Sequence, residues 1–591
     1  MHYSPGCRDK LANLRVVSDP VHGVIRIPQL LFDGIIDNPL YQRLRSIKQL
    51  ALTHYVYPGA VHTRFEHSLG VAHMADKILE GAISNTRRHI LSGCTCASPS
   101  DAECLSRVLD ELEAMRPALI TAALLHDVGH QAYSHNFEAA QRDLLLVLNE
   151  AAPGLGVDHE KVSVEMATLL HEKAGDECLA GILSDAVEIL KYAYDDEYRM
   201  EIEDNPEYRP ACPQGEGGEA NYRYLAISIL ASIISSPLDA DRLDFLYRDS
   251  YYSGNPLGYI DINRIYDIVV IVPYTDDKGQ RRLGLGITEK GTTVLESTLL
   301  ARQFMYNTVY LHPVSMGYDA MQSRLTALLY LVSRVLEDTG SIEDLPRTYR
   351  NLFGAVALGF QNPMELARVE GGRLSLALVD PLVDTVTFEI ARGEAPRQVY
   401  EAARSHSVWG ESLCLALALA SRGIALRRHW SYLMIKGEAA VKISSQLGSM
   451  VQGRHHILDL DKLRSLITPL VILSHETLKV YDSRKYRIYT TARAGGRTVV
   501  LDVIESGRAP ILTSLDAARG FMLSKIMILH PSPTYGPEVQ GWTGKKGKIT
   551  AEDIEEATRI CCTTRDTTKD LLSKAVEDAS RLASALLEAV P

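Results

Sequence analysis

Apolar and polar residues recur along most of the chain with the spacing of amphipathic helices. An Asx residue followed by proline at Asp37-Asn38-Pro39 predicts a helix that runs to about Leu50, and Pro117 opens a helix that ends at His126-Asp127. Further helices are expected over residues 61–79, 225–235, 290–310 and 413–426, the last of them buried. The pattern therefore predicts a mainly α-helical protein.

Strand-like alternation occurs in shorter stretches. Residues 266–288 and 487–504 each predict a β-hairpin, and residues 19–36 predict a short hairpin or extended piece. Residues 196–219 are rich in Asp, Glu, Pro and Gly, and we expect a surface loop there. Beyond about residue 340 the pattern is mostly amphipathic helix without a repeat or a catalytic motif, which favours a scaffolding or assembly role.

Composition is that of an ordinary soluble globular protein, with 591 residues of which 46% are hydrophobic and 23% charged. Such a chain can bury cores that need no covalent staples, and its nine cysteines lack the paired CxxC spacing of a zinc module. A reducing, cytoplasmic compartment is the simplest interpretation. The N-terminus lacks the apolar core of a signal peptide, and no apolar run approaches the roughly 18 residues that span a bilayer.

The net charge of −12 argues against a surface that wraps a long polyanion. Local basic clusters such as Arg43-Leu-Arg45-Ser-Ile-Lys48 can still bind a small ligand that carries phosphate. The sequence therefore favours a small-molecule ligand, and contact with the end of a nucleic acid stays open.

The first candidate for chemistry is His126-Asp127, because an adjacent imidazole and carboxylate can both reach one divalent ion where a helix ends. Two ligands are too few for a stable site. His67, three residues after Arg64 on one helix face, and Asp241, in a segment with four carboxylates in eleven residues, are the further candidates. Two imidazoles and two carboxylates suit Mn, Fe, Zn, Co or Ni, with Mg as a further candidate, and leave positions for water and substrate.

The order H…HD…D resembles the HD-domain metal phosphohydrolases. Longer motifs resemble the deoxynucleoside triphosphate (dNTP) triphosphohydrolases among them, most closely the sterile-alpha-motif/HD-domain dNTPases. These motifs are Asp19-Pro-Val-His-Gly, residues 37–50, residues 57–71, His126-Asp-Val-Gly-His130 with Ser134-His135, and Asp239-Ala-Asp241-Arg. They cover roughly residues 15–330, and no sterile-alpha-motif is expected before them.

The resemblance implies an HD-domain helical fold over residues 1–335, with a regulatory N-terminal segment over residues 1–50. A smaller, mixed helical and α+β C-terminal lobe is expected over residues 336–591. The implied metal ligands are His67, His126, Asp127 and Asp241. The implied catalytic residues are Arg64 at the α-phosphate and a general acid group of His135, Glu138 and His159.

For the substrate, the resemblance implies that the sugar and base are lined by Gln49, Leu50, Asp249 and Tyr310, and the phosphates by Arg242 and Arg302. A tyrosine packed against the sugar edge can exclude a 2′-hydroxyl, which favours a dNTP over an NTP. The sequence departs from the family pattern at three positions, with Glu138 in place of Asp, Phe245 in place of Tyr and Pro313 in place of Lys.

The same relatives are activated by nucleotides bound between the subunits of a tetramer. The residues that match their guanine-nucleotide site are Arg15, Val16, Asp37, Gln42 and Arg45. The second activator site is matched in part, by Lys290 and Arg264 but not by Thr288 or Val294. On pattern alone, Gln42, Arg45 and Gln49 form a solvated stripe of a helix, and the resemblance replaces that interpretation. We expect a homo-oligomer, a dimer or a tetramer, with an altered requirement for a GTP or dNTP activator.

The sequence therefore predicts a cytoplasmic, metal-dependent enzyme that hydrolyses a dNTP to deoxynucleoside and inorganic triphosphate. Water polarised by the metal would attack the α-phosphorus while the His135 group protonates the departing oxygen. Two alternatives stay open. One is an HD phosphodiesterase or nuclease that acts on a cyclic nucleotide or a nucleic-acid end, and the other is a non-catalytic nucleotide sensor.

Overall fold

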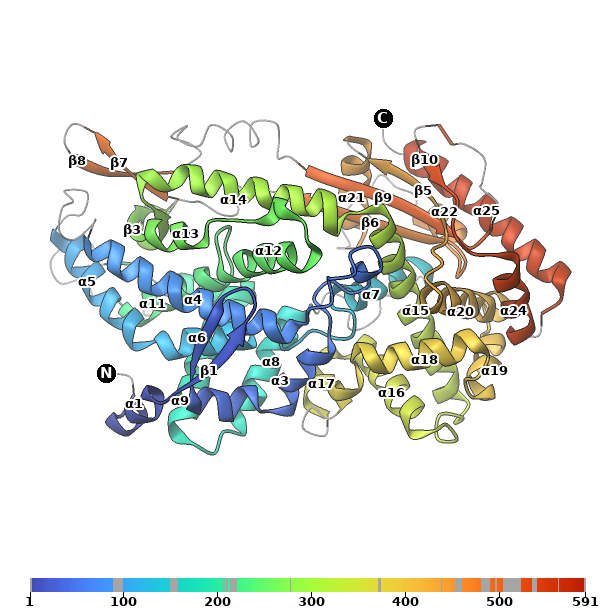
Figure 1. Ribbon diagram of the computed structural model, residues 1–591, viewed down its shortest axis with the longest axis horizontal. Coiled ribbons are helices and arrows are strands. Elements are labelled where there is room, and N and C mark those ends of the chain that lie inside the picture. Colours follow the sequence, from blue (N-terminus) through green and yellow to red (C-terminus); the bar gives the residue numbers. More distant parts are fainter. Residues whose placement is uncertain are drawn as a thin grey trace.

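A computed structural model of the chain is mainly α-helical (Figure 1). The structure describes all residues except 1–2, 89–98, 149–157, 206–207, 209–210, 213–220, 277, 370–373, 437, 452–459, 480–488, 495–496, 503–521, 534–538, 541, 562 and 589–591. Most of the helices that precede α15 gather on one side of the molecule, and the C-terminal helices gather with a β-sheet on the other. Helices α7 and α15 lie between the two groups and pack against each other.

The N-terminal segment begins with a short helix and a β-hairpin. These are α1 (Pro5–Ala12), β1 (Leu14–Asp19) and β2 (Gly23–Pro28), and the two strands pair antiparallel. The hairpin therefore starts earlier than the extended piece predicted from residue 19. The turn ends at Gly23, whose positive φ of 73° favours glycine.

The helix predicted from Asp37 to Leu50 is much shorter. It consists of α3 (Pro39–Gln42) and one 3₁₀ turn, η2 (Arg43–Ser46). Beyond η2 the backbone is held by tertiary partners: Lys48 N donates to the Asp380 carboxylate at 2.9 Å, and Gln49 N donates to the His62 carbonyl at 3.0 Å. These bonds replace the helical ones, so local propensity is overridden.

The helices predicted over residues 61–79, 117–127, 225–235 and 290–310 are present with adjusted ends, and further helices accompany them. The helices of the N-terminal side are α2 (Gln29–Leu31), the π-helix η1 (Phe32–Ile36), η3 (Thr53–Tyr55), α4 (Arg64–Thr86), α5 (Pro99–Ala114), α6 (Arg116–Leu125), α7 (His135–Leu148), α8 (His159–Glu172), α9 (Glu177–Tyr194), α10 (Asp196–Asp204), α11 (Tyr222–Ile234), α12 (Ala240–Ser253), η5 (Pro256–Gly258), α13 (Ile262–Ile268), η6 (Glu289–Gly291), α14 (Thr292–Met305) and the π-helix η7 (Tyr306–Tyr310). Helix α10 corrects part of the loop predicted over residues 196–219. Asp195 caps it by accepting from two backbone amides, so an acidic, turn-like composition still forms a helix.

The C-terminal side is also helical. Its helices are α15 (Pro313–Asp338), α16 (Arg347–Gln361), α17 (Pro363–Arg368), η9 (Leu374–Ala377), α18 (Asp380–Arg392), α19 (Arg397–Ser405), α20 (Gly410–Ala425), α21 (Glu438–Val451), α22 (Leu460–Leu466), α24 (Ala551–Cys561) and α25 (Arg565–Glu588). Helix α20 is fully buried from Leu413 to Ser421, as the sequence predicted for that segment. It packs on α15 and α18 and forms the centre of this side.

Within the part of the chain that the structure describes, two four-stranded sheets accompany the helices. One has the order β10-β5-β9-β6 and consists of β10 (Thr543–Lys545), β5 (Ser431–Lys436), β9 (Met522–His530) and β6 (Ile472–Lys479). The other has the order β3-β4-β7-β8 and consists of β3 (Val269–Thr275), β4 (Arg281–Ile287), β7 (Tyr489–Ala494) and β8 (Arg497–Asp502). Both predicted hairpins are present, and a parallel pairing of β4 with β7 joins them on the N-terminal side of the molecule (Figure 1).

Among the described residues, three disulfides cross-link distant segments, although the sequence predicted cores large enough to need no staples. They are Cys7–Cys178, Cys104–Cys212 and Cys414–Cys561, with sequence separations of 171, 108 and 147 residues. Partners this far apart come together only in the folded chain, so the spacing of cysteines along the sequence could not reveal them. Among the described helices, none has an apolar stretch long enough to cross a bilayer.

Candidate active site

The first turn of α4 carries two of the predicted site residues. Thr63 N donates to the Glu66 carboxylate at 3.1 Å, which is half of a capping box and fixes the start of the helix. Arg64 and His67 follow one turn apart on the face that points into the molecule, and both are buried. Local capping therefore places a guanidinium and an imidazole side by side.

The end of α6 carries the adjacent His126 and Asp127. The His126 Nδ1 atom lies 2.8 Å from the Ala123 carbonyl, so Nδ1 carries the proton and donates it. The lone pair on Nε2 then faces the other site residues. The turn that follows packs tightly on α8, since a Cβ on Gly129 would overlap the His159 carbonyl.

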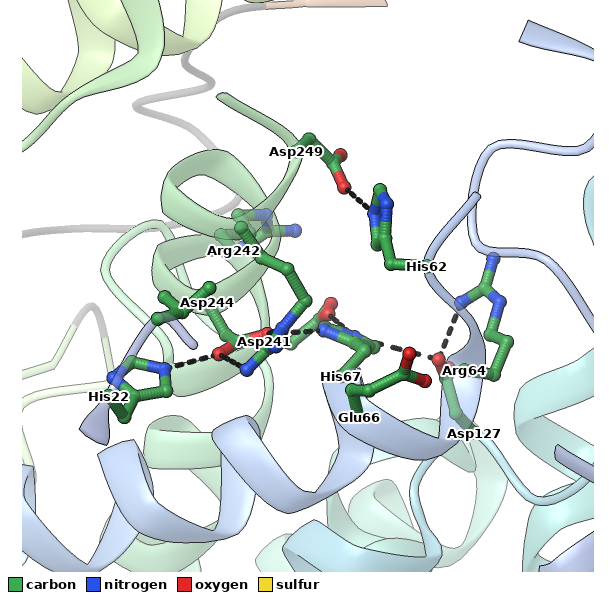
Figure 2. Close-up of polar contacts among 12 residues, drawn as sticks. His22, His62, Arg64, Glu66, His67, Asp127, Asp241, Arg242, Asp244 and Asp249 are labelled. Carbon is green, nitrogen blue, oxygen red and sulfur yellow. Dashed lines mark hydrogen bonds and ion pairs between the residues drawn. The ribbon is translucent and has the colours of Figure 1, made fainter. Parts of the chain in front are cut away.

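The start of α12 completes the group. Asp239 caps this helix by accepting from Arg242 N at 2.7 Å, which leaves Asp241 in the first turn. The Asp241 Oδ1 atom lies 3.0 Å from His67 Nε2 and 3.7 Å from His126 Nε2. The side chains of His67, Asp127 and Asp241 point toward one another (Figure 2).

These four residues fit a divalent cation. Ligand atoms of His67, His126 and Asp127 all lie within 4.8 Å of one another. His126 Nε2 is buried and has no hydrogen-bond partner among the described residues. Burial raises the pKa of Asp241, but His126 and His67 outweigh that effect and hold the pKa well below its usual value. Two charged carboxylates and two imidazole nitrogens that face one point are a donor set for a borderline metal.

Arg64 lies against this group on the side away from Asp241. Its Nη1 atom donates to Asp127, and its Nε atom donates to Ser134 Oγ at 3.0 Å. Burial raises the pKa of Asp127, but the positive charges of Arg64 and its histidine neighbours lower that pKa by more, so the carboxylate stays charged. Ser134 thus fixes the direction in which the guanidinium points.

The predicted general acid group is assembled by Glu138. Its Oε1 atom lies 2.7 Å from His159 Nδ1, and its Oε2 atom lies 3.3 Å from His135 Nδ1. His130 stacks on His159 with ring centroids 3.7 Å apart. Burial lowers the pKa of His159, but Glu138 raises it to about 9 overall. These four residues are also close enough to hold a cation, but a histidine that keeps its proton at neutral pH favours a proton donor here.

All six predicted substrate residues line one cavity of about 550 Å³, together with Arg64, Asp127 and Asp241. They are Gln49, Leu50, Arg242, Asp249, Arg302 and Tyr310. Asp249 is locked in the wall, because its two oxygens accept from His62 Nε2 at 2.7 Å and from the Tyr310 hydroxyl at 2.6 Å. Phe245 lies at the same wall, edge-on to Tyr310 with ring centroids 6.1 Å apart.

Sequence reasoning missed several residues of this cavity. Arg142 lies on the cavity face of α7, one turn after Glu138 and two turns after His135. It makes no ion pair with any described residue. Burial raises the pKa of Glu160, in the cavity wall, to about 7. The β6 segment Ile472–Ser474 also lines the cavity, so the C-terminal half contributes to the site. A cationic residue at a seven-residue spacing from His135 was the one signal available from sequence.

The predicted activator residues are grouped in part. The Arg15 guanidinium lies 3.9 Å from the Asp37 carboxylate, and Arg45 Nε donates to Gln42 Oε1 at 2.8 Å. Val16, next to Arg15 on β1, is 62% exposed. Lys290 lies in η6, on another element, between β4 and α14.

Residues 64–244 match the HD domain family, and this range contains all four candidate metal ligands. The chain contains an HD domain. The matched range begins at Arg64 and spans the elements that bring His67, His126, Asp127 and Asp241 together.

Similar proteins include HD proteins with and without a described activity. An uncharacterised protein of Methanocaldococcus jannaschii is 29% identical over 332 residues, 56% of this chain and 52% of that protein. The deoxynucleoside triphosphate triphosphohydrolase SAMHD1 of Xenopus laevis is 30% identical over 263 residues, 42% of this chain and 36% of that protein, and SAMHD1 of Gallus gallus is 32% identical over 255 residues, 41% and 34%. The chain thus spans about half of the first relative and about a third of the other two.

The fold of the chain is similar to that of a solved structure. The crystal structure of a phosphohydrolase from Bacteroides thetaiotaomicron is 23% identical and covers 88% of this chain and 100% of that chain, with a TM-score of 0.53. This likeness supports the fold alone.

Proposed function

We propose that the HD domain hydrolyses dNTPs to deoxynucleoside and inorganic triphosphate. The observation that carries the proposal is the convergence of His67, His126, Asp127 and Asp241 beside Arg64 at the wall of a cavity that all six predicted substrate residues line. A divalent ion, when bound by these four ligands, supplies a Lewis acid and acidifies water at neutral pH. The relatives named as dNTP triphosphohydrolases support the same reaction.

The chain's own residues account for the remaining steps. Arg64, held by Ser134, provides a fixed cation for the α-phosphate, where negative charge spreads as the bond to the leaving oxygen breaks. The Glu138 group holds a proton on His159 and orients His135, which is 63% exposed to the cavity and its surroundings. That group donates the proton to the departing 5′-oxygen.

Preference for a deoxyribose follows from the wall at Tyr310. The Tyr310 hydroxyl proton and the His62 Nε2 proton are both donated to Asp249, whose oxygens can only accept, so none of these three groups has a donor left for the oxygen of a 2′-hydroxyl. A ribose placed against this wall would lose the hydrogen bonds that water donates to its 2′-hydroxyl oxygen without replacement.

Product analysis tests the proposal. Purified protein supplied with Mn²⁺ is incubated with each of the four dNTPs and four NTPs, with and without GTP, and the products are separated by anion exchange. We expect deoxynucleoside and inorganic triphosphate from at least one dNTP and slower turnover of the NTPs. Release of pyrophosphate or of a nucleoside monophosphate would contradict the proposed cleavage at the 5′-oxygen.

We further propose that a nucleotide at Arg15, Asp37, Gln42 and Arg45 favours assembly of subunits. The Asp37 carboxylate beside the Arg15 guanidinium can read a guanine edge, and the Arg45 guanidinium, which is bonded to Gln42, can take a phosphate. Light-scattering mass measurement with and without GTP and dNTP tests this point. A single monomeric species under all conditions would contradict it.

A further inference from the structure

The turn between β1 and β2 reaches the back of the metal-ligand cluster. Asp19 Oδ1 accepts from Val21 N at 2.9 Å and from His22 N at 2.8 Å, so the turn has a fixed shape. His22 Nε2 lies 2.6 Å from Asp244 Oδ1, and its side chain is only 4% exposed (Figure 2). A carboxylate can only accept, so the His22 ring donates this hydrogen bond.

Asp244 connects that turn to His67. Its Oδ2 atom lies 2.8 Å from His67 Nδ1, so the proton of the His67 ring is held on Nδ1 and donated to Asp244. The opposite ring atom, Nε2, faces Asp241 and His126, and without a metal it shares its proton with Asp241 Oδ1 at 3.0 Å. A bound cation would take the Nε2 lone pair in place of that proton, while Nδ1 keeps its hydrogen bond to Asp244. Asp244 itself is fully buried, and it contacts His67 at Nδ1, the ring atom opposite Nε2.

Arg248 closes the network. Its Nε atom donates to Asp244 Oδ2 at 2.8 Å, and its Nη1 atom donates to Asp19 Oδ2 at 2.8 Å. Asp19, His22, Asp244 and Arg248 therefore form a closed ring of buried contacts. Two carboxylates that share one guanidinium and two imidazole donors can stay charged in this interior.

The approach of α12 to α4 depends on one glycine. A Cβ on Gly70 would overlap the Asp244 carboxylate and the Arg248 guanidinium. Any larger residue at this position would push Asp244 away from His67.

We infer that Asp244 is a positioning residue for His67, and that the β1–β2 turn sets its geometry through His22 and Arg248. A histidine that binds a metal through one ring nitrogen is oriented by the hydrogen bond of the other, and loss of that partner typically weakens metal binding about 10- to 100-fold. The inference rests on the proposed metal site. It gives a role to the Asp19-Pro-Val-His-Gly motif, which the proposed reaction itself does not use.

Titration of the metal-free protein with Mn²⁺, followed by the EPR signal of the free ion, tests this inference without any turnover. We expect Asp244→Asn to weaken Mn²⁺ binding about 10- to 100-fold. His22→Leu should weaken binding in the same direction. His22→Gln, whose amide can donate in place of Nε2, should restore binding toward the wild-type affinity.

Asp185→Asn is the matched control, because Asp185 is a buried carboxylate that pairs with Arg223 away from the metal ligands. It should lower the thermal midpoint but leave Mn²⁺ affinity unchanged. Equal Mn²⁺ affinities in wild type, Asp244→Asn and His22→Leu would overturn the positioning role alone. If wild type bound Mn²⁺ no better than a variant without His126 and Asp127, the metal site and the proposed function would fail together.

Discussion

Glu138 is one methylene longer than the aspartate of the resembled family, and its two oxygens reach two different histidines. The interaction with His159 matters most, because it keeps that ring protonated despite its burial. The folded pKa of His159 is about 9, against roughly 6.5 in an unfolded chain. The stabilisation that this pair contributes is full below about pH 6.5 and is lost as the pH rises through 9.

The pH dependence of turnover should follow the same proton. We expect kcat/KM for a dNTP to fall on the alkaline side with an apparent pKa near 9, because the proton donor empties there. Glu138→Gln should move this limb to lower pH, since the carboxylate that raises the pKa of His159 is gone. Glu172→Gln, at a partly exposed position at the far end of the helix that begins with His159, is the control and should leave the profile unchanged. An alkaline limb that stays in place in Glu138→Gln would contradict the assignment.

Single residues were predictable where their chemical type and order carried the signal. The sequence singled out His67, His126, Asp127 and Asp241 as candidate metal ligands, and the structure brings these side chains together. Asp244 was visible only as one of several carboxylates in its segment, because its role depends on where β1 and β2 place His22. Partners that meet across some two hundred residues leave no local pattern.

At the scale of elements, α18 from the C-terminal half supports the active-site turn between α6 and α7. Tyr133 and Ser134 have positive φ angles of 59° and 56°, which are unfavourable for non-glycine residues. Asp380, fully buried at the start of α18, accepts from Tyr133 N at 2.8 Å and from Lys48 N at 2.9 Å. The turn thereby presents Ser134 to Arg64.

Asp380→Ala should remove this support, because the Asp380 carboxylate accepts from Tyr133 N and Lys48 N. Loss of the carboxylate leaves two buried amides unpaired and should lower the free energy of unfolding by about 1–3 kcal/mol. We expect turnover to fall more than metal content, because Arg64 loses its orientation while the four ligands remain. Urea unfolding, elemental analysis and steady-state kinetics measure the three quantities. Thr385→Ala on the same helix is the control, and an Asp380→Ala variant with wild-type turnover would contradict the role.

Elements were predictable where capping and periodicity acted locally. The β3–β4 hairpin, the start of α3 at Asn38 and the end of α6 at His126 agree with the sequence. The helix prediction was wrong for residues 48–50, because the backbone amides of Lys48 and Gln49 bond to Asp380 and His62 rather than to the preceding turn. The parallel pairing of β4 with β7 joins residues about two hundred positions apart, which periodicity cannot reveal.

At the scale of the whole molecule, the disulfides join segments that are far apart in the sequence. Cys7–Cys178 ties the N-terminal helix to α9, and Cys414–Cys561 ties α20 to α24. A cross-link that closes a loop of more than a hundred residues restricts the unfolded chain strongly, by about 4–5 kcal/mol in the chain-entropy account. The sequence indicated neither these bonds nor the contribution of β6 to the cavity, since both depend on the final packing.

Reduction should therefore destabilise the protein. We expect a reducing agent to lower the thermal midpoint, and a Cys414→Ser variant to reproduce part of that change. In denaturant without reductant, at most three of the nine cysteines should react with a thiol reagent, because the six described ones are paired. Nine reactive thiols together with an unchanged midpoint on reduction would contradict the cross-links.

We propose that four side chains, far apart in the sequence, hold one metal ion that the reaction requires. The most direct measurement compares metal content and dNTP turnover in wild type and in the double variant His126→Ala/Asp127→Ala, with the same metal supplied to both. The account predicts bound metal and triphosphate release in wild type, and loss of both in a double variant that remains folded. A folded double variant that still releases triphosphate would contradict it.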